Sequence, residues 1–462
     1  MKRPVYHFSP KSGWMNDPNG IVYDGKAYHV FYQHNPKDVV WGPMHWGHAE
    51  SPDLLHFHHC PIAFYPDKPY DNEFGCFSGS ALPLEDGRIA FLYTGVSGGA
   101  QQQCLAYMDK DGSFLKYEHN PVIPSSSLPE GYDFHDFRDP FLFKEGDGYF
   151  ALLAAKNGSS KILLYESKDL INWHYRGLAY QNDALGEGMF ECPGLARFDD
   201  VDALIFSKQF TSPLLSCKNI HGSFYVLGKM DVASGRFLVK EGETPKELDY
   251  GYDFYAPLLF KDKHGHNALM AWQECWDRVY PSAKEGYVGK LTLPRRLRVK
   301  GGHLYQDIVS LDELYEDGIE KKDIDCSSFN ALGLHGDLFE LKLDLANPSL
   351  KPWKLAWGKG QGKEMALVYD GKSLYLDRSN DGSEYYVGKA SKDERDIRYL
   401  PLDDCTRISL RLVNDKTAFE LSINDGYLLS SGTISSSKGC DAIEISGDIA
   451  IGRLEFHNLQ GE

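Results

Sequence analysis

Three carboxylates in this chain stand in short motifs that are rich in turn formers and aromatic residues. Asp17 lies within Trp14–Gly20, Asp139 follows Arg138 in a Phe-Arg-Asp-Pro segment, and Glu191 lies between a Phe and a Cys-Pro pair. Two of the motifs also have a simple structural interpretation, which is a turn at Asp17 and a surface ion pair between Arg138 and Asp139. Two carboxylates that flank a sugar bond, with a further acid to hold hydroxyl groups, are typical of a glycosidase. The three acids therefore indicate glycoside chemistry, provided that the fold brings them into one pocket.

The spacing of hairpin turns places these acids in a repeat. Turn pairs recur about every 50 to 65 residues between apolar runs, which is near the length of a four-stranded propeller blade. The turns are Asp24-Gly25, Asp86-Gly87, Gly146–Gly148, Asp199-Asp200 and His264-Gly265. Seven to nine residues before each turn stand Asp17, Ser78, Asp139, Glu191 and Tyr255. The repeat predicts an all-β, five-bladed β-propeller whose inner strands bring these five side chains to one end of a channel. A generic β protein in which such turns recur is the alternative.

The pattern changes after about residue 300. The acidic segment Asp307–Glu320 is interpreted as a connector with helical character. Beyond it, segments such as Phe339–Leu345, Ile408–Leu412 and Phe419–Ile423 alternate apolar and polar residues, as strands of a β-sandwich do. We therefore predict a catalytic propeller domain at residues 1–305, a linker at 306–324 and a C-terminal β-sandwich domain at 325–462.

The composition disfavours several other classes of protein. Acidic residues outnumber basic ones 66 to 49, for a formal net charge of −17, which disfavours a nucleic-acid-binding surface. The chain contains no apolar run near the roughly 18 residues that span a bilayer, and its first residues lack the apolar core of a secretory signal. The nine cysteines form no Cys-x-x-Cys pair, so neither a zinc site nor a disulfide framework is expected. A reducing, cytoplasmic location is the simplest expectation.

The expected partner is a small-molecule carbohydrate, without nucleic acid or membrane, and the oligomeric state stays open. No cofactor is expected. The cluster His56–Cys60 contains three histidines and a cysteine, but it follows a surface hairpin and lacks a distal partner cluster. Since structural metal sites usually combine ligands from two such clusters, no metal is expected either.

The three carboxylate motifs resemble the three signature motifs of glycoside hydrolase family 32, the invertase and fructanase family. Five further segments match the family as well: Phe31–Pro36, Trp41–His48, Cys76–Ser80, Asp253–Pro257 and Leu291–Arg295. The match covers about residues 5 to 300, in order. It implies a five-bladed propeller followed by a β-sandwich, in agreement with the repeat.

The resemblance implies a role for each acid. Asp17 would be the nucleophile that attacks C2 of a β-linked fructosyl unit. Glu191 would protonate the leaving oxygen and then activate the water that hydrolyses the fructosyl-enzyme, while Asp139 would hold fructose hydroxyls. The matching pocket positions are Asn16, Gln33, Trp41, Phe77, Ser78, Arg138, Tyr255 and Trp276.

The surroundings of Glu191 suggest how the acids share protons. Phe190 and Cys192-Pro193 flank Glu191, and an apolar setting of this kind would disfavour its charged form, while Asp17 would keep a low pKa. Cys192 is expected to pack against Glu191 or to tune its acidity, because a thiolate beside an acid is disfavoured.

The chain departs from the family pattern at three places. Phe190 stands where a Trp is frequent, Leu258 where a Gln is common, and Tyr287-Val288 where a Trp is expected. These departures leave the three acids untouched, but they leave the leaving-group side of the pocket undefined.

We therefore expect a retaining β-fructofuranosidase that hydrolyses the terminal bond of sucrose or sucrose 6-phosphate through a fructosyl-enzyme intermediate. An exo-acting fructan β-fructosidase, acting on inulin, levan or fructooligosaccharides, is the alternative within the family. An inverting propeller glycosidase acting on arabinan or xylan and a non-catalytic sugar-binding propeller are more distant alternatives.

Overall fold

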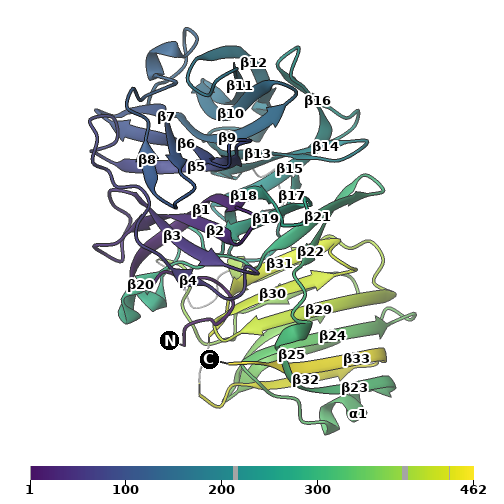
Figure 1. Ribbon diagram of the computed structural model, residues 1–462. Coiled ribbons are helices and arrows are strands. Elements are labelled where there is room, and N and C mark those ends of the chain that lie inside the picture. The colour runs from purple at the N-terminus through teal and green to yellow at the C-terminus, as the bar shows by residue number, and fades with distance from the viewer. Residues whose placement is uncertain (1, 212–216, 388–393, 436–437, 462) are drawn as a thin grey trace.

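The computed structural model describes residues 2–211, 217–387, 394–435 and 438–461, and these residues are almost entirely β-structure (Figure 1). The only α-helix in these ranges is α1, the short segment Cys326–Ala331. None of the helices described there is long and apolar enough to cross a membrane. The all-β class predicted from the sequence is confirmed.

Residues 13–308 form five sheets of consecutive antiparallel strands, which we call the sheet ring. The first four sheets contain β1 (Gly13–Tyr23), β2 (Tyr28–Asn35), β3 (His45–Ser51) and β4 (His58–His59); β5 (Gly75–Pro83), β6 (Ile89–Ser97), β7 (Ala100–Met108) and β8 (Phe114–Lys116); β9 (Phe137–Glu145), β10 (Gly148–Asn157), β11 (Ser159–Ser167) and β12 (Trp173–Gln181); and β13 (Phe190–Arg197), β14 (Asp202–Gln209), β15 (His221–Asp231), β16 (Arg236–Val239) and β17 (Lys246–Glu247). The fifth contains β18 (Tyr255–Lys261), β19 (Asn267–Trp272), β21 (Arg295–Lys300) and β22 (His303–Ile308).

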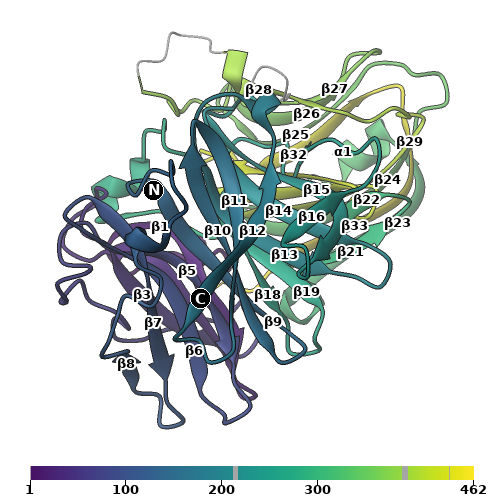
Figure 2. The same cartoon turned by 90° about the horizontal axis from the view of Figure 1, so that it is seen from above.

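The first strands of the five sheets close on one another. β1 contacts β5, β5 contacts β9, β9 contacts β13, β13 contacts β18, and β18 returns to β1. β20 (Tyr287–Val288), from the chain between β19 and β21, pairs parallel with β1 and so joins the fifth sheet to the first. Figure 1 shows these sheets around a common centre in the upper part of the view, and Figure 2 shows the purple N-terminal strands on the opposite side of the view from the green and yellow C-terminal strands.

Packing between neighbouring sheets explains why the inner strands are so apolar and aromatic. All eight residues of β2 are buried. Because successive side chains of a strand point to opposite faces, Val30 packs with Met270 of the fifth sheet, whereas Phe31 packs with Phe91 of the second. The hairpin before β2 is closed by Asp24, whose Oδ1 accepts the N–H groups of the two residues after Gly25, at 2.7 and 2.8 Å.

The C-terminal strands form two further sheets that pack face to face, which we call the sheet pair. One sheet has the order β23 (Tyr315–Asp325), β33 (Ala450–Leu459), β24 (Leu338–Ala346), β29 (Arg407–Asp415), β30 (Ala418–Ile423) and β31 (Leu428–Thr433). The other has the order β28 (Ile397–Leu400), β27 (Leu374–Asp377), β26 (Lys363–Tyr369), β25 (Trp353–Gly360) and β32 (Ala442–Gly447). Leu343 and Leu410 of the first sheet share one core with Leu355 and Leu367 of the second, as the alternating pattern requires.

The expectation of helical character for Asp307–Glu320 is wrong. This segment contains the end of β22, a single turn of 3-10 helix at Asp312–Leu314 and the first half of β23. β23 is an edge strand with an almost wholly exposed, charged surface, and it pairs with β33 at the far end of the chain. Charged side chains are usual on such edges, but they hide the alternation by which a strand is detected.

A buried network of charges joins the sheet pair to the sheet ring. Asp253 accepts hydrogen bonds from Arg278 Nε at 2.8 Å, from Arg378 Nη1 at 3.2 Å and from the Thr433 N–H at 2.8 Å. Both arginines and Asp253 are buried. The two guanidinium groups hold the pKa of Asp253 well below its usual value despite burial, which alone would raise it.

We predict that Asp253→Ala lowers the free energy of unfolding by about 3–5 kcal/mol, because it leaves two buried arginines without their shared partner. Urea unfolding followed by fluorescence measures the change. The control Asp200→Ala, at an exposed position, is expected to change the free energy by less than about 0.5 kcal/mol. Equal stability of the two variants would contradict the inference that this network holds the two parts together.

Candidate active site

All five first strands carry an irregularity at the same end. Each has one residue more than its partner strand there, so the pairing register shifts at Met15/Pro18, Cys76/Gly79, Arg138/Phe141, Glu191/Gly194 and Tyr255/Leu258. Such β-bulges redirect side chains and interrupt the ladder, and they are frequent beside active sites. Nine of the residues predicted for the site stand in or next to these bulges, where the strands meet: Asn16, Asp17, Phe77, Ser78, Arg138, Asp139, Glu191, Cys192 and Tyr255. Gln33 lies on β2, and Trp41 and Trp276 lie in loops.

Cys192 lies between two of the acids. Its Sγ is 3.7 Å from Asp17 Oδ2 and 3.8 Å from Asp139 Oδ2, and its N–H donates to Asp139 Oδ2 at 3.1 Å. Burial and the neighbouring carboxylates raise the pKa of Cys192 well above its usual value, so the thiol stays protonated and can donate its one S–H weakly to either acid. Three chain segments more than 50 residues apart thus meet at one thiol.

Asp17 is held by two neutral donors. Asn16 Nδ2 donates to its Oδ1 at 2.9 Å, and Ser78 Oγ donates to its Oδ2 at 2.7 Å. These hydrogen bonds favour the ionised form, but burial outweighs them and raises the pKa of Asp17 to about 6. The expected low pKa of Asp17 is therefore wrong, because the sequence does not reveal how far the other strands remove this half-buried carboxylate from water.

Asp139 is buried and has a left-handed backbone conformation, with φ of 61°. Its N–H donates to Thr94 Oγ1 at 3.0 Å. Burial raises the pKa of Asp139 to about 7, against the opposing effect of the Arg138 guanidinium. Arg138 Nε is 3.9 Å from Asp139 Oδ2, and both residues are buried, so this pair is not the surface ion pair of the simpler interpretation.

Glu191 has the most polar surroundings of the three acids. Arg138 donates to its Oε1 through Nη2 at 2.9 Å and Nε at 3.2 Å, Gln209 Nε2 donates to the same oxygen at 3.0 Å, and the Tyr255 hydroxyl donates to Oε2. The expected apolar setting is therefore wrong. Phe190 points to the opposite face of the strand and packs in the core between the third and fourth sheets, as strand alternation requires.

Aromatic side chains surround the acids. Trp276 stacks on Trp14 with ring centroids 5.7 Å apart, and Trp14 Nε1 donates to Asn16 Oδ1 at 2.8 Å. Trp41 is 39% exposed and lies edge-on to Phe77, with centroids 6.0 Å apart. These rings give the site apolar surfaces of the kind against which sugar rings pack.

One predicted residue lies behind the site. The Gln33 side chain is buried, and its Nε2 donates to the backbone oxygen of Cys76 at 2.9 Å. Gln33 therefore fixes β5 next to the bulge that contains Ser78. The other predicted residues contact the acids or the aromatic rings of the site directly.

Sequence reasoning missed two residues that position the Glu191–Arg138 pair. Gln209 is the last residue of β14 and donates to Glu191, and Gln101 Oε1 accepts from the Phe137 N–H at 2.9 Å and from Arg138 Nη1 at 3.3 Å. Neither glutamine stands in a motif. Gln209 lies on β14, the neighbour of β13, and Gln101 lies on β7, the third strand of its sheet. Only the fold reveals these contacts.

The arrangement combines three differently held acids. Asp17 accepts hydrogen bonds from neutral donors, the oxygens of Glu191 are fixed by charged and neutral donors, and Asp139 is buried beside Cys192. This set suits the stabilisation of a cationic, oxocarbenium-like centre together with proton transfer to a leaving oxygen.

Comparison with known proteins agrees with this chemistry. A family model described as the glycosyl hydrolases family 32 N-terminal domain matches residues 7–307. The chain is 33% identical to a sucrose-6-phosphate hydrolase of Escherichia coli, over 93% of this chain and 89% of that protein. It is 30% identical to a levanase of Bacillus subtilis, over 99% of this chain and 70% of the levanase. Among solved structures it resembles a sucrose-6-phosphate hydrolase of Lactobacillus gasseri, with a TM-score of 0.86, 28% identity and coverage of 99% and 93% of the two chains.

We predict that Asp139→Asn makes the protein more stable than the wild type at pH 8, by about 1–3 kcal/mol. The pKa of about 7 in the folded state lies above the unfolded value, so ionisation of this group costs stability as the pH rises from about 4 to 7. Asparagine carries no charge and tolerates a positive φ, so its advantage should vanish at pH 4. Urea unfolding at the two pH values tests this. The exposed control Asp147→Asn should show no difference, and a less stable Asp139→Asn at pH 8 would contradict the prediction.

Proposed function

The chain belongs to glycoside hydrolase family 32 and is a β-fructofuranosidase, and we propose that it acts by retention through a fructosyl-enzyme formed on Asp17. The observation that carries the mechanism is the meeting of Asp17, Asp139 and Glu191 at the bulged ends of three first strands, with Cys192 between two of the acids.

We propose the following roles. Asp17 attacks C2 of the fructosyl unit in its ionised form, while Glu191 gives its proton to the departing glycosidic oxygen. Three N–H groups are directed at Oε1 of Glu191, whereas Oε2 faces the Tyr255 hydroxyl. Because three donors already occupy Oε1, we assign the transferred proton to Oε2. After the first product leaves, Glu191 takes a proton from water, which attacks C2 and releases Asp17. Asp139 holds fructose hydroxyls in hydrogen bonds that strengthen as positive charge develops.

We also propose that the sheet ring is a five-bladed β-propeller and the sheet pair a β-sandwich. The closed contacts among β1, β5, β9, β13 and β18 support the first assignment, and the shared core of the two C-terminal sheets supports the second. We propose a boundary between Ile308 and Tyr315, within the predicted linker 306–324, and the ends of β22 and β23 support it. A cytoplasmic location is supported by the nine cysteines, all of which are free.

The substrate class follows from the relatives. Sucrose-6-phosphate hydrolases of Escherichia coli and Zymomonas mobilis are 33% and 30% identical to the chain, which favours sucrose or sucrose 6-phosphate, while the Bacillus subtilis levanase supports an exo-acting fructan hydrolase as the second candidate. Fructose release from sucrose, sucrose 6-phosphate, kestose and inulin separates the two. Release of fructose from none of them would favour the sugar-binding alternative, and inversion at C2, detected by NMR of the first product, would exclude a fructosyl-enzyme.

We predict that Asp17→Asn folds normally and loses at least about a thousandfold in kcat, because the amide cannot form the covalent intermediate. Kinetics with sucrose and mass spectrometry of acid-quenched reactions measure the loss of turnover and of the fructosyl adduct. The control Asp200→Asn should keep both. Near-normal turnover of Asp17→Asn would assign the nucleophile to another residue.

We predict that Ser78→Ala moves the acidic limb of the kcat/KM profile upward by about one pH unit. The wild-type limb should lie near pH 6, where Asp17 ionises. Removal of the Ser78 hydrogen bond withdraws about 1.5 kcal/mol of stabilisation from the ionised carboxylate, which raises its pKa. The control Ser113→Ala, at an exposed position in the turn after β7 at the opposite end of the same sheet, should leave the limb in place. A downward shift in Ser78→Ala would show that another group sets this limb.

A further inference from the structure

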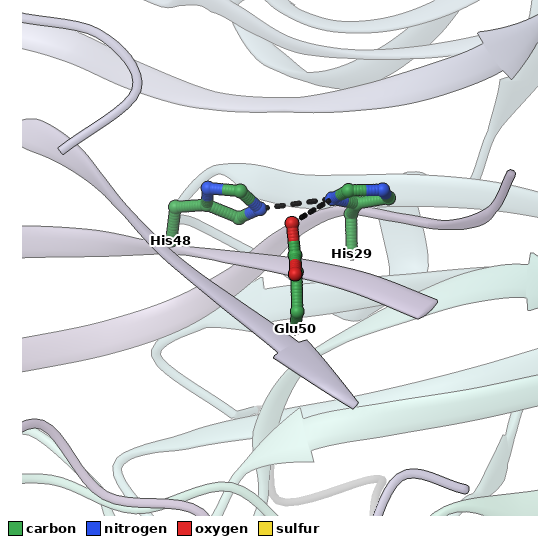
Figure 3. Close-up of side chains that lie close together, drawn as sticks. All are labelled: His29, His48 and Glu50. Carbon is green, nitrogen blue, oxygen red and sulfur yellow. Dashed lines mark hydrogen bonds and ion pairs between the residues drawn. The ribbon is translucent and has the colours of Figure 1, made fainter. Parts of the chain in front are cut away.

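Two histidines and a glutamate gather on one face of the first sheet, away from the catalytic acids. β2 and β3 pair so that His29 lies opposite Glu50 and Phe31 lies opposite His48. Because His48 and Glu50 are two residues apart on β3, their side chains point to the same face. Figure 3 shows the two imidazole rings facing each other, with the Glu50 carboxylate directed at the His29 ring.

The distances between the nitrogen and oxygen atoms are those of a metal site. His29 Nδ1 is 3.0 Å from His48 Nε2 and 3.7 Å from Glu50 Oε1, and the three atoms lie within 4.8 Å of one another. Zn–N bonds are about 2.0–2.1 Å long, so two imidazole nitrogens on a tetrahedral zinc ion stand about 3.3 Å apart. A small rotation of either ring is enough to admit the ion.

The surroundings prepare both imidazoles to act as ligands. His48 stacks on Phe31 at a centroid distance of 4.5 Å and lies edge-on to Phe114 at 5.4 Å. These ring contacts hold the imidazole in the orientation that directs its Nε2 at His29.

The second nitrogen of His29 points to a carboxylate. His29 Nε2 is buried and has no hydrogen-bond partner among the described residues, but Asp24 Oδ2 lies 3.5 Å from it. A carboxylate behind a histidine fixes the tautomer that leaves the other nitrogen free for the metal, and it strengthens that nitrogen as a ligand. Asp24 Oδ1 is already engaged by the hairpin turn, so Oδ2 is the oxygen available for this role.

We propose that His29, His48 and Glu50 bind one divalent transition-metal ion of the zinc class, with Asp24 as the carboxylate behind His29. A groove of about 500 Å³ at this end of the sheet, lined in part by Asp24, His29 and Glu50, gives the ion access and leaves a coordination position for water. On binding, the proton between the two rings moves to Nδ1 of His48, so that Nε2 is free for the ion and both imidazoles stay neutral.

The site joins two strands of one sheet, and its function is to stabilise that sheet. His29 pairs with Val22, five residues beyond Asp17 on β1, or about 17 Å along the strand. The ion therefore lies too far from the reacting atoms to take part in fructosyl transfer. It is expected to raise the melting temperature, since a ligand that binds the folded state shifts unfolding upward.

The test uses the full-length protein without an affinity tag, stripped with EDTA and titrated with Zn²⁺ and with Co²⁺. We expect one Zn²⁺ per chain by elemental analysis, visible absorption bands from the Co²⁺ form, and a melting temperature that rises with Zn²⁺. Asp24→Asn, which keeps the turn acceptor, should weaken Zn²⁺ binding by about 10- to 100-fold. Glu50→Gln replaces a ligand whose side chain is 44% exposed. It should weaken Zn²⁺ binding at least about tenfold, because loss of a residue that only supports a ligand already costs that much.

The control variant is His56→Gln. His56 is exposed, pairs with Asp53, and belongs to the cluster His56–Cys60. Its replacement should leave Zn²⁺ affinity and the Co²⁺ spectrum unchanged. The proposal is overturned if the tag-free protein binds no Zn²⁺ at millimolar concentration, if Glu50→Gln and Asp24→Asn bind as the wild type does, or if His56→Gln is the variant that loses the ion.

Discussion

The catalytic centre depends on the interruption of five hydrogen-bond ladders at one end of the sheet ring. In four of the first strands a proline stands at the interruption: Pro18, Pro140, Pro193 and Pro257. Proline has no N–H to give to the ladder, so a regular strand cannot continue through it. A regular strand buries alternate side chains between neighbouring sheets, as Val30 and Phe31 do in β2. At a bulge the side chain is released from that alternation and meets those of the other strands.

The three acids repel one another when they are ionised, and their neighbouring groups compensate this repulsion to different extents. Glu191 receives the guanidinium, an amide and a hydroxyl group, whereas Asp17 has neutral donors and Asp139 shares the guanidinium at 3.9 Å. Burial therefore places the pKa of Asp17 at about 6 and that of Asp139 at about 7. Near neutral pH the three acids therefore carry fewer than three negative charges, and ionisation of one makes ionisation of the others less favourable. Such sharing suits a reaction in which one acid is ionised while another delivers a proton.

The sequence predicted what depends on local chemistry. Turn pairs such as Asp24-Gly25 mark hairpins because their side chains close them, and the residues at fixed distances before the turns converge because the repeat is regular. Contacts made by the outer strands were not predictable: Gln209 reaches Glu191 only through the pairing of β14 with β13. The segment Asp307–Glu320 was misjudged for the same reason, since β23 becomes a strand through a partner more than 100 residues away. The extent of burial, and with it the pKa of Asp17, depends on all five sheets together.

The sheet pair carries none of the acids, yet it is connected to the active site by packed groups. Its Tyr385 carbonyl accepts the N–H of Val279 at 2.9 Å, and Arg395 Nη1 lies 2.9 Å from Asp277 Oδ2. These contacts fix the segment that follows Trp276, whose ring stacks on Trp14. The indole N–H of Trp14 donates to the side chain of Asn16, and Asn16 in turn donates to the nucleophile Asp17. The contacts therefore run from the sheet pair through the Trp276 and Trp14 rings to Asn16. The second part of the chain therefore belongs to the architecture of the pocket as well as to the stability of the molecule.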